Sequence, residues 1–409
     1  MMKKILIWDT FPLQNTGGPM GYLYNIHEYL KLYPTDQITF LSDVMIEKFG
    51  DAEWFHPVYS STNSRNRFTQ ICYQLRKAYR MCLKPFWQVE YKVPKEINID
   101  QYDYVHIHII THVSQFRKLF PHYKGKVILT IHCPCTWTDE ILSYTASEKS
   151  KLYKITKHLR PIILREECKA YKSADYIMFP CQGAREPYEK TPQVKQVFTE
   201  CNSKFFYVPS AIVDYKPDVK AIQHYSDFGI PKDAFVITYF GRHIAVKGYD
   251  ILCDVGVELL NKIPNLYILC AGKGEIEKPN HARWIELGFI NNVDDLLAQS
   301  NLYILPNRET YFDLITLQIL RAGVPLLLST TGGNNYFREL SNEQTKGLRY
   351  FDINNRNQIV EETIALIDLY THHSDAYTEM GKANRRLYET QFTMNKYVER
   401  YIQSIDSLS

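Results

Sequence analysis

Short apolar runs alternate along the chain with longer segments in which apolar residues recur every three or four positions. The runs are rich in β-branched and aromatic residues and predict strands, whereas the longer period predicts helices with one buried face. The helical pattern fills most of the gaps, for example over residues 248–262, 313–322 and 356–369. The expected strands are "KILIWD" (4–9), "QITFLS" (37–42), "YVHIHI" (104–109), "VILTIH" (127–132), "YIMFP" (176–180), "FFYVPS" (205–210), "FVITYFG" (235–241), "LYILCAG" (266–272), "WIELGF" (284–289), "LYILPN" (302–307) and "PLLLST" (325–330).

The strands fall into two series, which indicates two domains. Strands that are apolar almost throughout and are separated by helices are typical of parallel sheets covered on both faces. We therefore expect an α/β fold with two Rossmann-like, doubly wound domains. The boundary is placed near "VPSAIVDYKPD" (208–218), where a strand ends and prolines flank a polar stretch, giving domains over residues 1–210 and 211–385. Residues 386–409 are expected to form a C-terminal helix that packs back toward the first domain.

Composition narrows the class of protein. The 409 residues, 45% of them hydrophobic, are enough for two or three domains. The formal net charge of +3 gives no general basic character, so we expect no nucleic-acid partner. No apolar stretch reaches the roughly 18–20 residues that span a membrane. The N-terminal "MMKKILIWD" has only a short apolar run and is expected to be a strand rather than a signal peptide.

The cysteines and two closely spaced histidines are the candidates for a metal site. The nine cysteines are scattered, and reduced thiols in a cytosolic protein are the simplest interpretation. The "HCPC" segment (132–135) lacks a second Cys or His pair at zinc-site spacing. His106 and His108 alternate along an expected strand and therefore share one face, but the sequence gives no third ligand. We expect no metal site, and a structural role for this histidine pair.

Glycines and polar residues follow many of the expected strands, where two α/β domains would form a ligand cleft. In "GRHIAVKG" (241–248), Arg242 and Lys247 follow a buried strand. Two cations on one turn can clamp a phosphate, and the alternative is a solvated basic loop. The other residues and segments that follow strands are Gly17, Gly18, Gly21, His132, Gly272, Gly274, "NRETYFDL" (307–314) and "TTGG" (330–333).

Taken in order, these segments resemble the motifs of a GT-B glycosyltransferase of the family-4 type, one of the glycosyl transferases of group 1. That family carries a Gly-Gly loop after its first strand, an "HxH" strand, a later "TxH", and "GR…KG" at the opening of its second domain. Each piece is weakly specific, but the ordered set spans nearly the whole chain. The matching segments are Gly17–Gly18, "HIH" (106–108), "TIH" (130–132), "GRHIAVKG" (241–248), "AGKG" (271–274), "GFI" (288–290), "PNRETYFDLITLQILRAGVP" (306–325) and "TTGG" (330–333).

The resemblance implies a reaction. In this family the C-terminal domain holds a nucleotide-sugar and the N-terminal domain largely sets the acceptor, which would be a glycan, a lipid-linked glycan or a protein. A UDP-sugar is the default donor by family frequency, and retention of anomeric configuration is implied. If a fixed Arg and Lys stabilise the leaving diphosphate, no metal or other cofactor is needed. The resemblance assigns catalytic roles to Arg242, Lys247, His132 and Glu309.

The resemblance also assigns donor contacts. A helix that starts near Asp313 would present backbone N–H groups and the positive end of its dipole to phosphate. "TTGG" offers a second glycine-rich approach, and an ordinary strand-to-helix turn is the alternative. The donor-binding residues expected on this basis are Gly17, Gly18, Gly241, Gly272, Gly274, Phe289, Ile290, Thr310, Asp313, Leu314, Ile315, Gln318, Gly332 and Gly333.

The chain departs from the family between residues 309 and 318. The family has two glutamates eight positions apart, the first contacting the donor sugar and the second the ribose. Here those positions are Thr310 and Gln318, and Glu309 reaches the sugar only if the loop is shifted by one residue. The family's glycine is Asp313, which either caps the helix or faces and repels the diphosphate. A non-catalytic GT-B protein, acting as a partner or binding module, therefore stays open as an alternative.

Two features of the first domain concern the acceptor side. The resemblance places His132 in the cleft near the reacting sugar, and a purely structural histidine is the alternative. Residues 64–95 are basic with interleaved aromatic residues, and residues 149–172 add further basic residues. Such segments can lie on an anionic membrane surface or form the solvated face of a helix. We expect a cytoplasmic protein, attached to the inner face of the membrane if residues 64–95 dock there.

Overall fold

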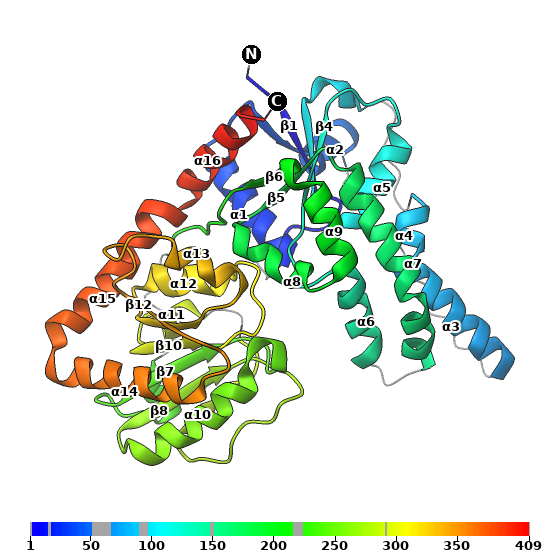
Figure 1. The fold of residues 1–409 in the computed structure, drawn as a ribbon. Helices are drawn as coiled ribbons and strands as arrows, with labels where there is room; N and C mark the ends of the chain where they lie inside the picture. The colour runs from blue at the N-terminus through cyan, green and yellow to red at the C-terminus, as the bar shows by residue number, and fades with distance from the viewer. Residues whose placement is uncertain are drawn as a thin grey trace. The chain divides into compact units, whose positions relative to one another are not determined.

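A computed structural model gives the fold as two compact units, each built around one parallel sheet (Figure 1). Unit 1 consists of Met1–Pro180, Arg185–Val208 and Val398–Ser409, and unit 2 of Cys181–Ala184 and Pro209–Tyr397. The separate domains expected over 1–210 and 211–385, with 386–409 as an appended helix, stay predictions. The residues that the structure describes are 2–14, 18–50, 67–89, 97–147, 151–215, 224–290 and 293–408.

The sheet of unit 1 has the strand order β2-β1-β3-β4-β5-β6, and every pair described is parallel. All residues of β1 and β3 are buried, so helices must cover both faces of the sheet, as the apolar sequence predicts. The order reverses between β1 and β3. The strands are β1 (Ile5–Trp8), β2 (Ile38–Phe40), β3 (Tyr104–Ile107), β4 (Lys126–Thr130), β5 (Tyr176–Phe179) and β6 (Phe205–Tyr207).

The helices of unit 1 include the longest described, the 23-residue α7. The last residues of α16 also belong to this unit, where the Tyr401 hydroxyl lies 2.7 Å from His106 Nδ1 on β3. The helices are α1 (Gly18–Leu32), α2 (Leu41–Phe49), α3 (Arg67–Cys82), α4 (Lys84–Trp87), α5 (Ile110–Leu119), α6 (Trp137–Ser147), α7 (Lys151–Ser173), α8 (Glu186–Glu189), α9 (Pro192–Glu200) and α16 (Met394–Asp406).

The sheet of unit 2 has the order β12-β11-β10-β7-β8-β9, again with parallel pairs throughout the described ladder. This is the order of the dinucleotide-binding doubly wound fold, in which the chain reverses direction across the sheet between its first and fourth strands. Here those strands are β7 and β10. The strands are β7 (Phe235–Phe240), β8 (Leu266–Ala271), β9 (Trp284–Glu286), β10 (Leu302–Leu305), β11 (Leu326–Ser329) and β12 (Leu348–Phe351).

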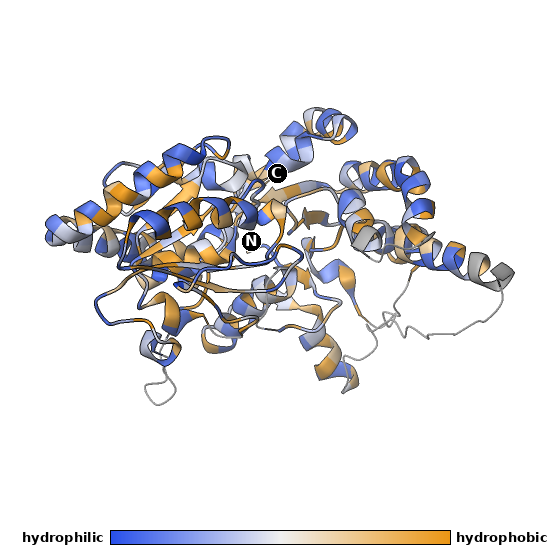
Figure 2. Ribbon diagram, turned by 90° about the horizontal axis from the view of Figure 1, so that it is seen from below, coloured by the Kyte–Doolittle hydropathy of each residue, from blue (hydrophilic) through white to orange (hydrophobic). Residues whose placement is uncertain are grey.

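Alternate residues of β7 show how this sheet is covered. Phe235, Ile237 and Tyr239 share one face and pack in a buried cluster with α10 and α14. Figure 2 shows the resulting distribution of hydropathy: the strands are mostly orange, whereas the helices carry both apolar and polar residues. The helices of unit 2 are α10 (Tyr249–Lys262), α11 (Asp294–Leu297), α12 (Leu314–Ala322), α13 (Asn335–Arg338), α14 (Arg356–His372) and α15 (Ser374–Leu387).

The expected fold class, two Rossmann-like doubly wound domains, is confirmed by these two sheets. Every strand predicted from the sequence is present, usually one to three residues shorter at its end, and β12 is an addition that the sequence analysis did not anticipate. Among the described residues, no helix combines the length and the apolar character needed to cross a membrane.

Candidate functional site

Two loops of unit 2 meet where its strand order reverses. The loop after β7 contains residues 241–248, and the loop after β10 contains residues 306–313. They are joined by a hydrogen bond from Arg308 N to Val246 O of 2.9 Å, and Gly248 lies so close to Pro306 that a Cβ would sit 1.7 Å from its carbonyl oxygen. In open α/β sheets, ligands bind beyond the carboxyl ends of the strands at this reversal. The structure thus brings the two polar segments singled out from the sequence to the expected place.

The turn between Arg242 and Lys247 is held from the sheet side by Tyr239. Its buried hydroxyl lies 3.0 Å from Arg242 O and 3.4 Å from Lys247 O. Arg242 is exposed, and none of the described residues accepts a hydrogen bond from its guanidinium or pairs with it. Lys247 differs, since only 18% of its side chain is exposed. Of the two cations of the predicted clamp, Arg242 is therefore open to solvent and Lys247 is largely shielded from it.

Lys247 forms an ion pair with Asp313. Its Nζ lies 2.7 Å from Asp313 Oδ2, and the same oxygen accepts a hydrogen bond from the side-chain amide of Asn307. Asp313 is the N-cap residue of α12, but its side chain makes no capping bond. The suggestion that it caps the helix is wrong for the side chain, because the carboxylate is turned to Lys247. Asn307, fully buried, is a site residue that the sequence analysis did not single out.

A second ion pair lies beside the first. Arg308 donates to both carboxylate oxygens of Asp250, at 2.7 and 2.6 Å, and to Ala245 O at 2.5 Å. This pairing holds the pKa of the Asp250 carboxyl below its usual range. The guanidinium therefore serves to fasten the loop after β10 to the turn that carries Lys247.

Gly272 and Gly274 lie beside this turn, in the loop after β8. His243 N donates to Lys273 O at 3.0 Å, and His243 and Gly274 form an isolated parallel bridge. Gly272 has a φ of 151°, and a Cβ there would lie 1.8 Å from Gly241 O; at Gly274 it would lie 2.1 Å from His243 O. Chain packing alone thus requires glycine at both positions, and donor contact stays a prediction.

The "TTGG" segment packs against the other loop of the site. A Cβ on Gly332 would lie 2.2 Å from Thr310 O, and one on Gly333 1.8 Å from Tyr311 O. The Thr310 side chain is fully buried and donates to Thr331 O at 2.6 Å. Thr310 therefore joins two loops, and the structure gives it no exposed atom toward a donor.

The remaining predicted donor residues are spread along the same edge of unit 2. Leu314 and Ile315 lie in the first turn of α12, where a helix leaves backbone N–H groups without intrahelical partners. Gln318 is one turn further along, partly buried, and Glu309 is partly buried in the loop. Phe289 is 68% exposed and Ile290 partly exposed after β9.

A buried polar cluster lies under the turn. The His243 ring stacks on Tyr249 at 3.8 Å, and Tyr249 donates to Glu286 Oε2 at 3.0 Å. Burial raises the pKa of Glu286 and lowers that of His243, because it disfavours the charged form of each group. None of these three residues was predicted, because a histidine inside "GRHIAVKG" carries no signal of its partners.

In unit 1, the predicted His132 belongs to a row of three histidines. His108 Nδ1 lies 3.0 Å from His132 Nε2, and the His106 and His108 rings are 4.1 Å apart. His106 is bonded at both ring nitrogens, to Tyr401 and Thr130, and Tyr22 packs on His132 at 4.8 Å. Burial lowers the pKa of His132 and of His106 to about 3. All three rings are therefore neutral at pH 7.

Two glycines that the sequence predicts to contact the donor, Gly17 and Gly18, come earlier in the chain than the three histidines. Gly18 begins α1 with a φ of 74°, whereas Gly17 lies outside the described residues. Within the part of the chain that the structure describes, no group of three His, Cys, Asp or Glu side chains is arranged to hold a metal ion. His132 supplies the third histidine that the sequence analysis lacked, but both nitrogens of His106 are already used.

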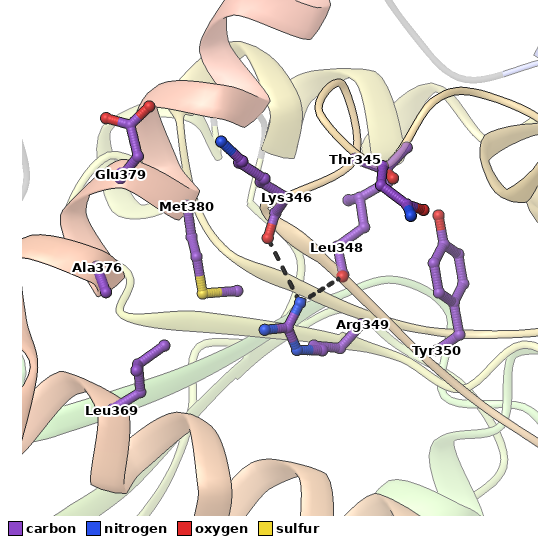
Figure 3. A pocket seen from close by; sticks show the side chains of 10 residues that line it. Thr345, Lys346, Leu348, Arg349, Tyr350, Leu369, Ala376, Glu379 and Met380 are labelled. Carbon is purple, nitrogen blue, oxygen red and sulfur yellow. Dashed lines mark hydrogen bonds between the residues drawn. The ribbon is translucent and has the colours of Figure 1, made fainter.

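A separate cavity of about 660 Å³ lies at the β12 edge of unit 2 (Figure 3). Its apolar floor includes Leu348, Leu369 and Met380, and Arg349 folds back onto Leu348 O and Lys346 O. None of the residues predicted to bind the donor lines it. The cavity is therefore distinct from the candidate site.

Comparisons with known proteins agree with this geometry. Residues 234–368 match the family model described as "Glycosyl transferases group 1". The O-antigen biosynthesis glycosyltransferase WclY of Escherichia coli is 23% identical over 192 residues, which cover 44% of this chain and 49% of that protein. An uncharacterized glycosyltransferase of Methanocaldococcus jannaschii is 20% identical over 255 residues, 58% of this chain and 60% of that protein. The chain thus spans about half the length of the first of these relatives.

Solved structures define the fold class. HepE from Anabaena in complex with UDP has a TM-score of 0.59 at 12% identity, with both chains covered completely. Its complex with UDP-glucose gives 0.58 at 14% identity over 99% of this chain and 100% of that one. A glycosyltransferase from Rickettsia africae gives 0.59 at 14% identity, again with both chains covered completely. The fold is GT-B, and the resemblance to group 1 glycosyltransferases is confirmed.

Proposed function

We infer that the protein is a glycosyltransferase that takes a sugar from a nucleotide-sugar, with a UDP-sugar as the expected donor. The observation that carries this is the placing of Arg242, Lys247 and the N-terminus of α12 at the strand reversal of unit 2. The family match covers all three. The solved HepE complexes contain UDP and UDP-glucose, which supports the same class of ligand here.

The proposed chemistry needs a stabilised leaving group. Transfer breaks the bond between the anomeric carbon and a phosphate oxygen, and negative charge builds on the departing diphosphate. Arg242 would meet that charge with a planar, permanently charged fork, and the first turn of α12 would add backbone donors. The new bond forms between the anomeric carbon and an acceptor oxygen, whose proton passes to the leaving phosphate. Attack from the same face gives retention, without a protein nucleophile or a metal.

The acceptor is proposed to be a glycan or a lipid-linked glycan, with a protein as the alternative. The relative WclY is named for O-antigen biosynthesis, which supports a polysaccharide product. A cytoplasmic location with attachment to the inner face of the membrane would suit a lipid-linked acceptor. His132, which follows β4, would then be an uncharged ring at pH 7.

A non-catalytic GT-B protein is the second candidate, and two observations favour it. Thr310, where the family has its first glutamate, is buried and used within the protein. Lys247 is neutralised by Asp313. Neither observation changes the exposed state of Arg242, so we keep the enzyme as the main proposal.

Thermal unfolding with a panel of nucleotide-sugars tests whether a donor binds. A ligand at 100 times its dissociation constant adds about 2.7 kcal/mol of stability. We expect one UDP-sugar and UDP itself to raise the melting temperature and uridine to raise it less, because uridine lacks the phosphates. Excess chelator should leave these shifts and any slow donor hydrolysis unchanged. Binding without hydrolysis supports the non-catalytic candidate. The absence of a shift with any nucleotide contradicts the enzyme and leaves the non-catalytic GT-B protein in its place.

A further inference from the structure

The electrostatic state of the site is set by one carboxylate. Asp313 Oδ2 receives both Lys247 Nζ, at 2.7 Å, and the amide of Asn307. Less than a fifth of either charged side chain is exposed, at 18% for Lys247 and 17% for Asp313. Such a pair is screened by water and salt less than a surface pair, so the attraction between its two charges is stronger.

The position of this carboxylate is one that favours an anion. Asp313 directly precedes α12, a nine-residue helix, and the N-terminal end of a helix carries a partial positive charge. A lysine ammonium and a helix N-terminus are together the elements with which proteins bind phosphate. Here an internal carboxylate already holds the ammonium.

We propose that Asp313 is a specificity-determining residue of this site, because a phosphate group can reach Lys247 only by displacing the Asp313 carboxylate. This rests on the proposed function, since the phosphate in question is that of the donor. If the pair stays closed, the diphosphate lies beside a fixed negative charge; if it opens, the Lys247–Asp313 attraction is lost. In both cases a nucleoside diphosphate binds more weakly, and the exposed Arg242 supplies most of the contacts with its phosphates.

The carboxylate of Asp250 cannot have the same effect. Asp250 is held by both guanidinium nitrogens of Arg308, and that arginine also binds Ala245 O. Releasing it would loosen the loop rather than expose a lysine. A matched control should therefore come from elsewhere in the unit, and Asp254, paired on the surface with Arg356, supplies the same loss of one charge.

The test is titration calorimetry with UDP and with inorganic pyrophosphate, on the full chain. Asp313→Asn keeps an oxygen that can accept from Asn307 but removes the charge, so we expect affinity for both ligands to rise about tenfold. Asp313→Ser, which keeps a good N-cap residue, should do the same if the asparagine variant folds poorly. Asp254→Asn should change affinity less than twofold, and uridine should bind all four proteins alike. Pyrophosphate makes the result independent of the base.

Two outcomes would overturn the inference and are distinguishable. If the wild type binds UDP and neither Asp313 variant binds it more tightly, Asp313 does not compete with phosphate, although the proposed function stands. If neither the wild type nor the folded variants bind UDP or pyrophosphate at millimolar concentration, the inference and the proposed donor site both fail.

Discussion

Three histidine rings of unit 1 form a row that determines their charge. His106, His108 and His132 lie within hydrogen-bonding or stacking distance of one another, with Tyr22 and Tyr401 packed at the two ends. Burial lowers the pKa of each ring, and the neighbouring rings lower that of His106 and His108 further. A proton on any ring would be costly, so the row is kept neutral.

This neutrality predicts a loss of stability in acid. A histidine that titrates near 6.5 when unfolded and near 3 when folded binds more protons in the unfolded state between those values, so stability falls as the pH drops through this window. His106 alone should lower the free energy of unfolding by about 2 kcal/mol between pH 7 and pH 5. The pKa of Asp9, raised to about 7 by burial, acts in the opposite direction over the same range.

Denaturant unfolding at pH 7 and pH 5 measures the effect, with His106→Gln as the matched variant. Glutamine can still bond Thr130 but has no proton to gain, and Asp9 acts equally in both proteins. The wild type should lose about 2 kcal/mol more than the variant. Equal losses, or histidine NMR signals of the row that titrate near pH 6.5, would show that the rings are not held neutral.

The residue scale also shows how far the site could be predicted. Arg242, Lys247 and the start of α12 were found because each follows a buried apolar strand, which is a local signal. The Lys247–Asp313 pair joins residues 66 positions apart, and the sequence left Asp313 with two roles. Nothing local decides between them, because the choice depends on how two loops pack. Asn307 and Glu286 escaped notice for the same reason.

At the scale of elements, the strands were predictable because burial on both faces leaves a nearly continuous apolar run. β12 (Leu348–Phe351) is the exception. It is an edge strand in which Arg349 and Tyr350 are partly exposed, so its sequence "LRYF" has no apolar run. The glycine loops show a different limit. Carbonyl groups leave no room for a Cβ at the glycines of "AGKG" and "TTGG", so chain packing alone accounts for them, and the donor contact expected there stays a prediction.

The basic helix α3 (Arg67–Cys82) carries the membrane prediction. Tyr73, Arg76 and Arg80 are exposed on one face, while Ala78 and Cys82 are buried. Residues 64–66 and 90–95 of the predicted segment lie outside the described residues. An exposed face with cationic and aromatic side chains fits an anionic lipid surface and equally fits solvent.

Sedimentation with vesicles decides between these two interpretations. If α3 docks, the protein should sediment with phosphatidylserine-containing vesicles at low salt and less at high salt, because surface attraction is screened. Arg76→Glu with Arg80→Glu should abolish this, whereas Lys232→Glu with Lys278→Glu, the same charge change at exposed sites of unit 2, should not. Equal behaviour of the two double variants, or equal binding to neutral vesicles, would leave α3 as a solvated face.

On the scale of the whole molecule, the order of motifs carried more information than any one of them. Single motifs such as "GF" or "TxH" occur by chance. The order in which the motifs follow one another along two doubly wound sheets, however, agrees with the GT-B fold of the solved structures. The donor sugar and the acceptor that we propose would be selected by side chains, and this chain departs from the pattern that it resembles at Thr310 and Gln318. Those features therefore cannot be carried over from the fold.

The most direct test of the account is turnover of the nucleotide-sugar that binds, measured for the wild type and for Arg242→Ala. Arg242 is exposed and unpaired among the described residues, so its removal should leave the fold intact, which unfolding curves can check. Loss of one preorganised donor at a developing charge typically costs about 10²–10³-fold in turnover, and we expect a loss of that size. A folded Arg242→Ala protein that releases UDP from the donor at the wild-type rate would contradict the account.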